Sequence, residues 1–150
     1  MKVDKVVWVK YISELEDLSG YMHPKYKSKQ VITACTKRYH NCLYLLMGLS
    51  ASCRDLMDYL CEQMDSENHV HSNETVRATF IAFVDKVTKS EIQYTQSTVK
   101  KAFNILASKG LIIPKSRGTY IVNPEYFFRK GEKDRIEAIK VVLEFKEKKK

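Results

Sequence analysis

The sequence predicts a mainly helical α+β fold, and three observations support this expectation. Only five glycines and three prolines interrupt the 150 residues, and 44% of the residues are apolar, so a compact folded chain is expected. Apolar residues recur at helical spacing in three segments between residues 50 and 108. Two short apolar runs then flank Ser116-Arg117-Gly118, which is the pattern of a β-hairpin.

The first two helices are predicted from residues that can cap their amino-terminal ends. Ser52 and Asp55 have the spacing of a capping box, which predicts a helix that continues to about Asp65. Asn73 is expected to cap the second helix, after a polar loop over residues 65–72. The expected buried faces are Cys53, Leu56, Met57, Leu60 and Met64 in the first helix, and Val76, Phe80, Phe83, Val84 and Val87 in the second.

The third helix is predicted to run from Gln96 to Ser108. Thr95 is its expected N-cap, and Gly110 is the expected stop. Helical spacing places Val99, Ala102, Phe103 and Leu106 on one apolar face. The opposite face is polar or cationic and contains no acid; it consists of Ser97, Lys100, Lys101, Asn104 and Ser108.

Three helices followed by a basic-tipped hairpin are the element order of a winged helix-turn-helix. Such a third helix fits the major groove of DNA when its inner face is apolar and its outer face is small, polar or cationic. An ordinary surface helix is the alternative, but this outer face lacks acids in a chain that has 18, and the formal net charge is +8. We therefore expect a binder of double-stranded DNA. The expected contacts are Thr95, Gln96, Ser97, Lys100, Lys101, Asn104 and Ser108 of the helix, with Lys115 and Arg117 at the hairpin tip.

The remaining segments are predicted to flank this winged helix. Residues 50–130 form the predicted DNA-binding domain, residues 1–49 an N-terminal extension packed on the core, and residues 131–150 a C-terminal helix with a basic tail. Residues 8–18 have helical spacing, although β-branched residues at positions 6, 7 and 9 leave a strand open as the alternative. Residues 21–30 are predicted as a loop, 31–39 as a strand and 40–47 as a short buried helix. Ile136, Ile139 and Leu143 are expected on one side of the C-terminal helix, where they complete the core or contact a second copy in a homodimer.

The third helix and the segment after the hairpin also resemble a known family. The matching stretches are Ser97-Thr98-Val99-Lys100-Lys101-Ala102-Phe103, Ala107-Ser108-Lys109-Gly110-Leu111-Ile112, and Gly118 to Phe128 (GTYIVNPEYFF) with the following Arg129, Lys130 and Gly131. They resemble the RepL family of small plasmid replication proteins over about residues 50–135, and the Asn-Pro-x-Tyr-Phe-Phe segment is the most specific part. The resemblance implies DNA binding and origin recognition for a plasmid, phage or integrated element, with host replication proteins as further partners.

The residues of that specific segment have an expected structural role as well. Asn123 is expected to cap the turn that follows the hairpin, and Pro124 to end the second hairpin strand. Tyr126, Phe127 and Phe128 are then expected to fold back as core aromatics, with base stacking as the less favoured alternative.

Other functional classes receive little support from the sequence. The cysteines Cys35, Cys42, Cys53 and Cys61 form no C-x-x-C pair, so buried free thiols in a reducing cytoplasm are expected rather than a metal site or disulfides. No apolar run is long enough to cross a membrane, and the first residues lack a signal-peptide core. Phosphate-loop, serine-hydrolase and zinc-protease motifs are missing, so neither a cofactor nor an enzymatic activity is expected.

Three alternatives to origin recognition stay open. The same helix would serve a transcriptional regulator of a mobile element, and winged helices also act as protein-interaction modules. The pair His69 and His71, with Tyr21 and Lys25, has spacings found in metal-dependent nicking enzymes of rolling-circle replication. In this sequence the tyrosine precedes the histidines and Pro24 interrupts its segment, so a chance pair of loop histidines is favoured.

Overall fold

A computed structural model describes residues 6–18, 21–32 and 36–149, and before residue 36 it describes the backbone only. The chain divides into two compact units, residues 1–35 and 36–150. Each unit is described by itself below.

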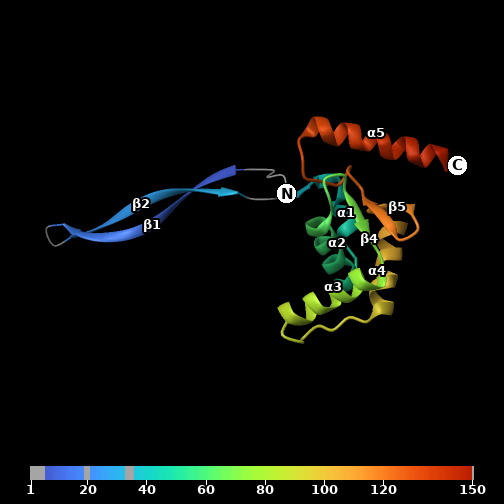
Figure 1. Cartoon of the computed structure of the whole chain (residues 1–150), viewed down its shortest axis with the longest axis horizontal. Coiled ribbons are helices and arrows are strands. Elements are labelled where there is room, and N and C mark those ends of the chain that lie inside the picture. Colours follow the sequence, from blue (N-terminus) through green and yellow to red (C-terminus); the bar gives the residue numbers. More distant parts are fainter. Residues whose placement is uncertain (1–5, 19–20, 33–35, 150) are drawn as a thin grey trace. The chain divides into compact units, whose positions relative to one another are not determined.

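The first unit is a two-stranded antiparallel ribbon (Figure 1). Its strands are β1 (Val6–Leu18) and β2 (Tyr21–Ile32), which pair from Val6 opposite Ile32 to Leu18 opposite Tyr21, with an irregularity between Ile12 and Glu14. The strand alternative for the first segment is thus confirmed, and the expected helix over residues 8–18 and the loop over 21–30 are wrong. Pairing along the whole length of both strands outweighs the helical spacing of a few apolar residues.

The second unit contains the remaining helices and strands. They are β3 (Lys37–Arg38), a short 3-10 helix η1 (His40–Cys42), α1 (Leu43–Leu46), α2 (Ala51–Gln63), β4 (His69–His71), α3 (Glu74–Val87), α4 (Gln96–Ser108), β5 (Ile112–Ser116), β6 (Thr119–Val122), β7 (Phe127–Phe128) and α5 (Glu132–Lys148). The predicted α+β, mainly α class is confirmed. The strand predicted over residues 31–39 matches only the end of β2 and β3, and residues 33–35 lie outside the described part of the chain.

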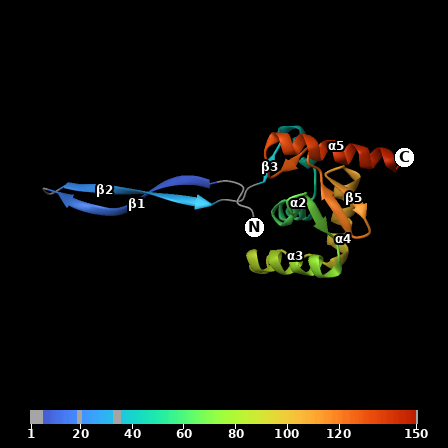
Figure 2. The same ribbon diagram turned by 45° about the horizontal axis from the view of Figure 1, so that its top comes forward.

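A small sheet lies between two apolar layers. Its strand order is β4-β6-β5 and both pairings are antiparallel. Ile112 and Val122 belong to the main core with α2 and α4, whereas Ile113 and Ile121 cluster with Val142 of α5. Figures 1 and 2 accordingly show α5 on one side of the second unit and α3 on the other.

Strand β4 corrects the prediction that residues 65–72 form a loop. His69 pairs with Ile121 and His71 with Thr119, while Val70 between them is buried in the main core. The partner strand lies about fifty residues further along the chain. Three residues with one apolar side chain carry no strand signal of their own, so only this long-range pairing makes the segment a strand.

The helix caps follow the predictions with one correction. Asn73 and Thr95 accept hydrogen bonds from the backbone N–H of Val76 at 2.8 Å and of Thr98 at 3.2 Å. The N-cap of α2 is Ser50, which is extended and accepts from the N–H of Cys53, whereas the predicted cap Ser52 lies inside the helix. The predicted N-cap was therefore two residues too late, because serine occurs at both position 50 and position 52.

The predicted buried faces of α2 and α4 are confirmed in full. On α3 only Phe80 and Val84 are buried, and the side chains of Phe83 and Val87 are 47% and 63% exposed. The buried stripe of α3 is therefore narrower than its apolar residues suggest. Phe83 nevertheless contacts α2, since its ring centroid lies 5.6 Å from that of Tyr59. The predicted short buried helix over 40–47 is also wrong in its burial, since Leu43, Tyr44 and Met47 are exposed.

The segment after the hairpin folds as predicted. Asn123 accepts from the N–H of Glu125 and donates from Nδ2 to the carbonyl of Gly110 at 2.9 Å, so it caps the turn and ties it to the end of α4. Phe127 and Phe128 are buried and Tyr126 is half-buried. These aromatics therefore pack in the core.

Helix α5 exposes two of the three apolar residues that were expected either to complete the core or to contact a second copy. Val142 is buried, whereas Ile136 and Leu143 are 48% and 53% exposed and Ile139 is half-buried. The first turn fixes this rotation, because the guanidinium of Arg135 donates to the carbonyls of Pro124 and Glu125. The sheet contacts Val142, so the expectation that Ile136 and Leu143 complete the core is wrong, and their contact with a second copy stays a prediction.

Candidate nucleic-acid interface

Helix α4 presents a polar face to solvent. Val99, Ala102, Phe103 and Leu106 are buried against the rest of the second unit. Six of the predicted helical contact residues are exposed, namely Thr95, Ser97, Lys100, Lys101, Asn104 and Ser108. No acid occurs in α4. The exposed face can therefore approach a polyanion without like-charge repulsion from its own helix.

Gln96 differs from the other predicted contacts because its amide is already bound within the protein. The side chain is half-buried. Its Oε1 accepts from Nε of Arg77 at 2.9 Å, and its Nε2 donates to the carbonyl of Glu74 at 3.3 Å. Gln96 therefore links the start of α4 to the start of α3, and its acceptor oxygen is engaged.

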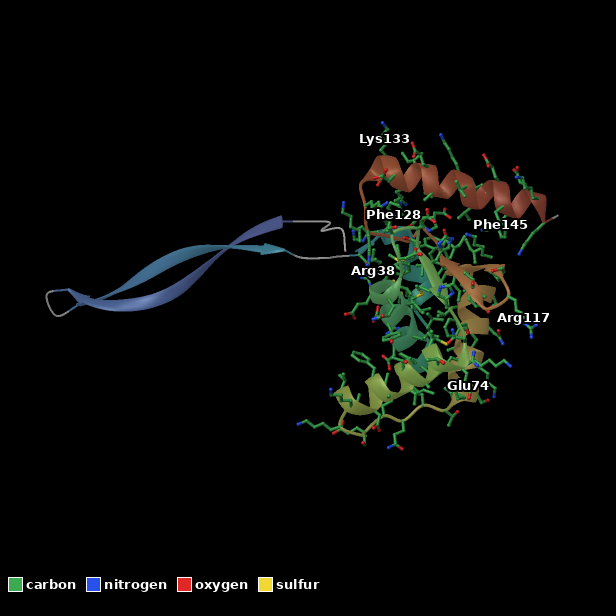
Figure 3. The ribbon with its side chains drawn as sticks, viewed as in Figure 1. Arg38, Glu74, Arg117, Phe128, Lys133 and Phe145 are labelled. Atoms are coloured by element: carbon green, nitrogen blue, oxygen red, sulfur yellow. The ribbon has the colours of Figure 1, made fainter. Side chains whose placement is uncertain are left out.

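The hairpin tip places Arg117 in solvent. Gly118 completes the turn with a positive φ of 75°, a conformation that glycine adopts without strain. The side chain of Arg117 extends away from the body of the second unit (Figure 3). Arg117 therefore lies at the hairpin tip, the position that the sequence predicted for it.

Lys115 lies on a different surface from Arg117. Its Nζ is 2.8 Å from Nε2 of His69, and both residues line a groove with Val142 and Phe145 of α5. The structure thus brings Arg117 to the tip but directs Lys115 toward the α5 side of the sheet. The sequence analysis grouped Lys115 with Arg117, because the faces of the strand around the bulge after Pro114 could not be assigned from the sequence.

Two residues that the sequence analysis did not single out connect the parts of this surface. The backbone N–H of Ser72 donates to the carbonyl of Gly118 at 2.8 Å, which joins the hairpin turn to the start of α3. Nη1 of Arg77 donates to the carbonyl of Ser72 at 3.1 Å. The partners of the Arg77 side chain come from two segments, the residue before the cap of α3 and the start of α4, so periodicity could not reveal its role.

The histidine pair lies on strand β4, not in a loop. Nδ1 of His69 is 3.3 Å from the carboxylate of Asp65, and Nδ1 of His71 is 3.3 Å from the hydroxyl of Thr119. Burial raises the pKa of Asp65, but hydrogen bonds from the backbone of His69 and Glu67 and the nearby His69 ring outweigh it and hold that pKa below its ordinary value. Within residues 36–149, whose side chains are described, no group of three or more His, Cys, Asp or Glu residues could hold a metal ion.

Comparison with known families gives one result. The model of the RepL family, described as Firmicute plasmid replication protein, matches residues 57–150. The chain belongs to the RepL family. The matched region of this RepL protein includes β4, α3, α4, the hairpin and α5, and therefore the whole surface described above. Membership supports a role in plasmid replication.

No curated protein and no solved structure gives a significant match to this RepL protein. Among the described residues, no helix combines the length and the apolar character that a bilayer-crossing segment requires.

Proposed function

We propose that this RepL protein binds double-stranded DNA sequence-specifically and recognises the replication origin of its plasmid. The observation that carries the proposal is the acid-free, solvent-exposed face of α4, with Arg117 at the tip of the following hairpin. The order α3, α4, β5, β6 supports a winged-helix mode of binding, in which α4 enters the major groove and the hairpin contacts the backbone or the minor groove. The protein acts in the cytoplasm by binding and not by catalysis, and host replication proteins act after it.

Lys100 and Lys101 supply phosphate neutralisation in this proposal. Replacing both by alanine should weaken binding to a duplex selected from random DNA by roughly tenfold to a hundredfold and reduce its salt dependence. A variant that loses Lys86 of α3 and Lys148 of α5 removes the same charge from two other exposed positions and should bind almost as well as the unaltered protein. Equal affinity of the folded Lys100→Ala/Lys101→Ala variant and the parent, measured by fluorescence anisotropy, would exclude α4 as the DNA-binding helix.

We further propose that a second copy of the protein docks on the outer face of α5. Ile136, Ile139 and Leu143 occur there at helical spacing and are partly or largely exposed. Lys133, Lys140 and Glu147 recur every seven residues beside them. In an antiparallel pair of α5 helices centred on Lys140, Lys133 of each copy faces Glu147 of the other. These two opposite-charge pairs complement the apolar contacts and flank the two Lys140 side chains, which lie opposite each other.

Sedimentation velocity tests this dimer. The substitutions Ile136→Glu and Leu143→Glu together should give a folded monomer. Glu147→Lys alone should weaken the dimer, and Lys133→Glu added to it should restore association, since the charge pair is then exchanged. A parent protein that stays monomeric at all accessible concentrations would refute the proposed homodimer and leave DNA binding untouched.

A further inference from the structure

A shallow concavity lies where the start of α3 meets the start of α4. Its lining residues are Glu74, Arg77, Gln96, Ser97 and Lys100. Glu74 lies at this edge of the second unit, on the same side as Arg117 (Figure 3). Four of the five lining side chains carry hydrogen-bond donors and two of them are cations, a combination that favours an anionic ligand.

The guanidinium of Arg77 is held firmly in this concavity. Its Nε donates to Gln96 at 2.9 Å, and its Nη1 donates to the carbonyl of Ser72 at 3.1 Å and to the Ser72 hydroxyl at 3.4 Å. Within the described residues these bonds use Nε and Nη1, which leaves the Nη2 donors for an acceptor from outside. A preorganised guanidinium loses little side-chain entropy when it binds, so it is well suited to a phosphate oxygen.

The same contacts decide which atoms Gln96 can offer to a ligand. Arg77 carries donors only, so the amide oxygen must be the atom that faces it, and the amide nitrogen faces the carbonyl of Glu74. A glutamine that reads adenine uses its oxygen and its nitrogen together. Here Arg77 and the carbonyl of Glu74 fix the orientation of the amide and use one lone pair of its oxygen and one of its two N–H donors, so Gln96 is held in place by α3 and is not free to turn toward a base.

We propose that Arg77, Gln96, Ser97 and Lys100 form a site for one phosphate of the DNA backbone. This inference rests on the proposed DNA binding and divides the exposed surface by role. The concavity fixes the position of the protein on the duplex, while Asn104, further along the exposed face of α4, remains to contact bases. Because Ser72 also bonds to Gly118, Arg77 connects the phosphate site to the hairpin tip.

Glu74 is the one acidic residue among the described residues that line this concavity, and its carboxylate repels an anion bound there. Its carboxylate weakens binding of a phosphate by like-charge repulsion. Glu74→Gln should therefore raise the affinity for any duplex several-fold. Glu91→Gln removes the same charge from an exposed residue beyond the end of α3, so a larger gain for Glu74→Gln than for Glu91→Gln identifies the anion site.

The test measures the salt dependence of binding for the full chain. The probes are a duplex obtained by selection from random DNA and a scrambled duplex of the same length. Arg77→Met should weaken binding to both duplexes by the same factor, about tenfold, and reduce the slope of log affinity against log salt by about 0.9. Lys86→Met removes one cation from the exposed end of the same helix and should leave that slope nearly unchanged.

Asn104→Ala provides the contrasting result. It should lower the preference for the selected duplex over the scrambled one and leave the slope unchanged, because base contacts release no counterions. Arg77→Met would overturn the phosphate site if it changed only this preference, or if it left both affinity and slope unchanged. Should Arg77→Met fail to fold by circular dichroism, Glu74→Gln decides the matter, and an unchanged affinity of that variant overturns the site.

The failure of the proposed function has a different signature. A parent protein that shows no salt-dependent binding to either duplex would refute DNA binding itself. A parent that binds, with Arg77→Met and Glu74→Gln indistinguishable from it, would refute only the phosphate site.

Discussion

At the scale of single residues, Asn68 is a buried polar side chain that joins separate strands by hydrogen bonds. It is 2% exposed and has a positive φ of 63°. Its Nδ2 donates to the carbonyls of Val122 and Phe127, at 3.0 Å and 2.8 Å, so one side chain joins the start of β4 to the end of β6 and to β7. Asparagine satisfies both demands, because it tolerates a left-handed backbone and supplies two donors.

Two substitutions of Asn68 separate these contributions to stability. Asn68→Gly keeps the left-handed backbone accessible but removes both hydrogen bonds, which should lower the free energy of unfolding by about 2–3 kcal/mol. Asn68→Ala should cost about 1 kcal/mol more, because alanine adds backbone strain. Urea denaturation followed by circular dichroism measures both changes; equal stability of the two variants would show that the left-handed conformation carries no cost.

The described thiols should be chemically inert in the native protein. Cys42, Cys53 and Cys61 are free and buried, and burial is the largest of the causes that raise the pKa of Cys61 to about 12. Thiolates are the reactive species, so these residues should react with Ellman's reagent only as the chain unfolds. A Cys35→Ser variant removes the remaining cysteine, which lies outside the described residues; rapid reaction of one thiol in that folded variant would contradict the burial.

The phenol of Tyr94 makes the stability of the second unit depend on pH in the alkaline range. Its hydroxyl donates to the carboxylate of Asp55 at 2.6 Å, and desolvation together with this acid raises its pKa to about 12. In the unfolded chain the phenol of Tyr94 has its ordinary pKa near 10. The contribution of this phenol to stability is therefore complete below pH 10 and is lost as the pH rises toward 12. Tyr94→Phe should flatten the loss of stability between those pH values in urea titrations. An identical alkaline profile for both proteins would show that Tyr94 does not contribute.

At the scale of elements, the start of α2 offers a matched test of capping. Ser50 accepts the hydrogen bond from Cys53, and Ser52 lies within the first turn. Ser50→Ala should lower the free energy of unfolding by about 1 kcal/mol. Ser52→Ala should change it by only a few tenths, since alanine is the better helix former. The reverse order in thermal or urea unfolding would restore Ser52 as the cap.

Elements with local signals were predictable, and elements that depend on distant partners were not. Helix α4 has the predicted bounds because Thr95 and Gly110 mark its ends within a few residues of sequence. Strand β4 was missed because its pairing with β6 is its main determinant. In the interface, exposure along α4 followed from helical spacing, whereas the engagement of Gln96 by Arg77 and the separation of Lys115 from Arg117 depend on tertiary contacts. Periodicity contains no information about such contacts.

At the scale of the whole molecule, the division of the chain has a direct consequence. Residues 36–150 form a compact unit with their own core. A fragment of those residues should therefore fold, with a melting temperature within a few degrees of the full chain and the same salt dependence of DNA binding. Differential scanning calorimetry and anisotropy measure these properties. A fragment that is unfolded at room temperature would show that the core depends on the first unit.

The separation of the two faces of α4 bears on how plasmids of this kind diverge. The residues that hold the helix in place, such as Phe103 and Leu106, are distinct from those that face solvent, such as Lys101 and Asn104. Outward residues can therefore mutate with little penalty to folding. Under the proposed function, an initiator and its origin can change together through a few surface substitutions. Two related plasmids can then coexist in one cell, because the protein of one no longer initiates replication of the other.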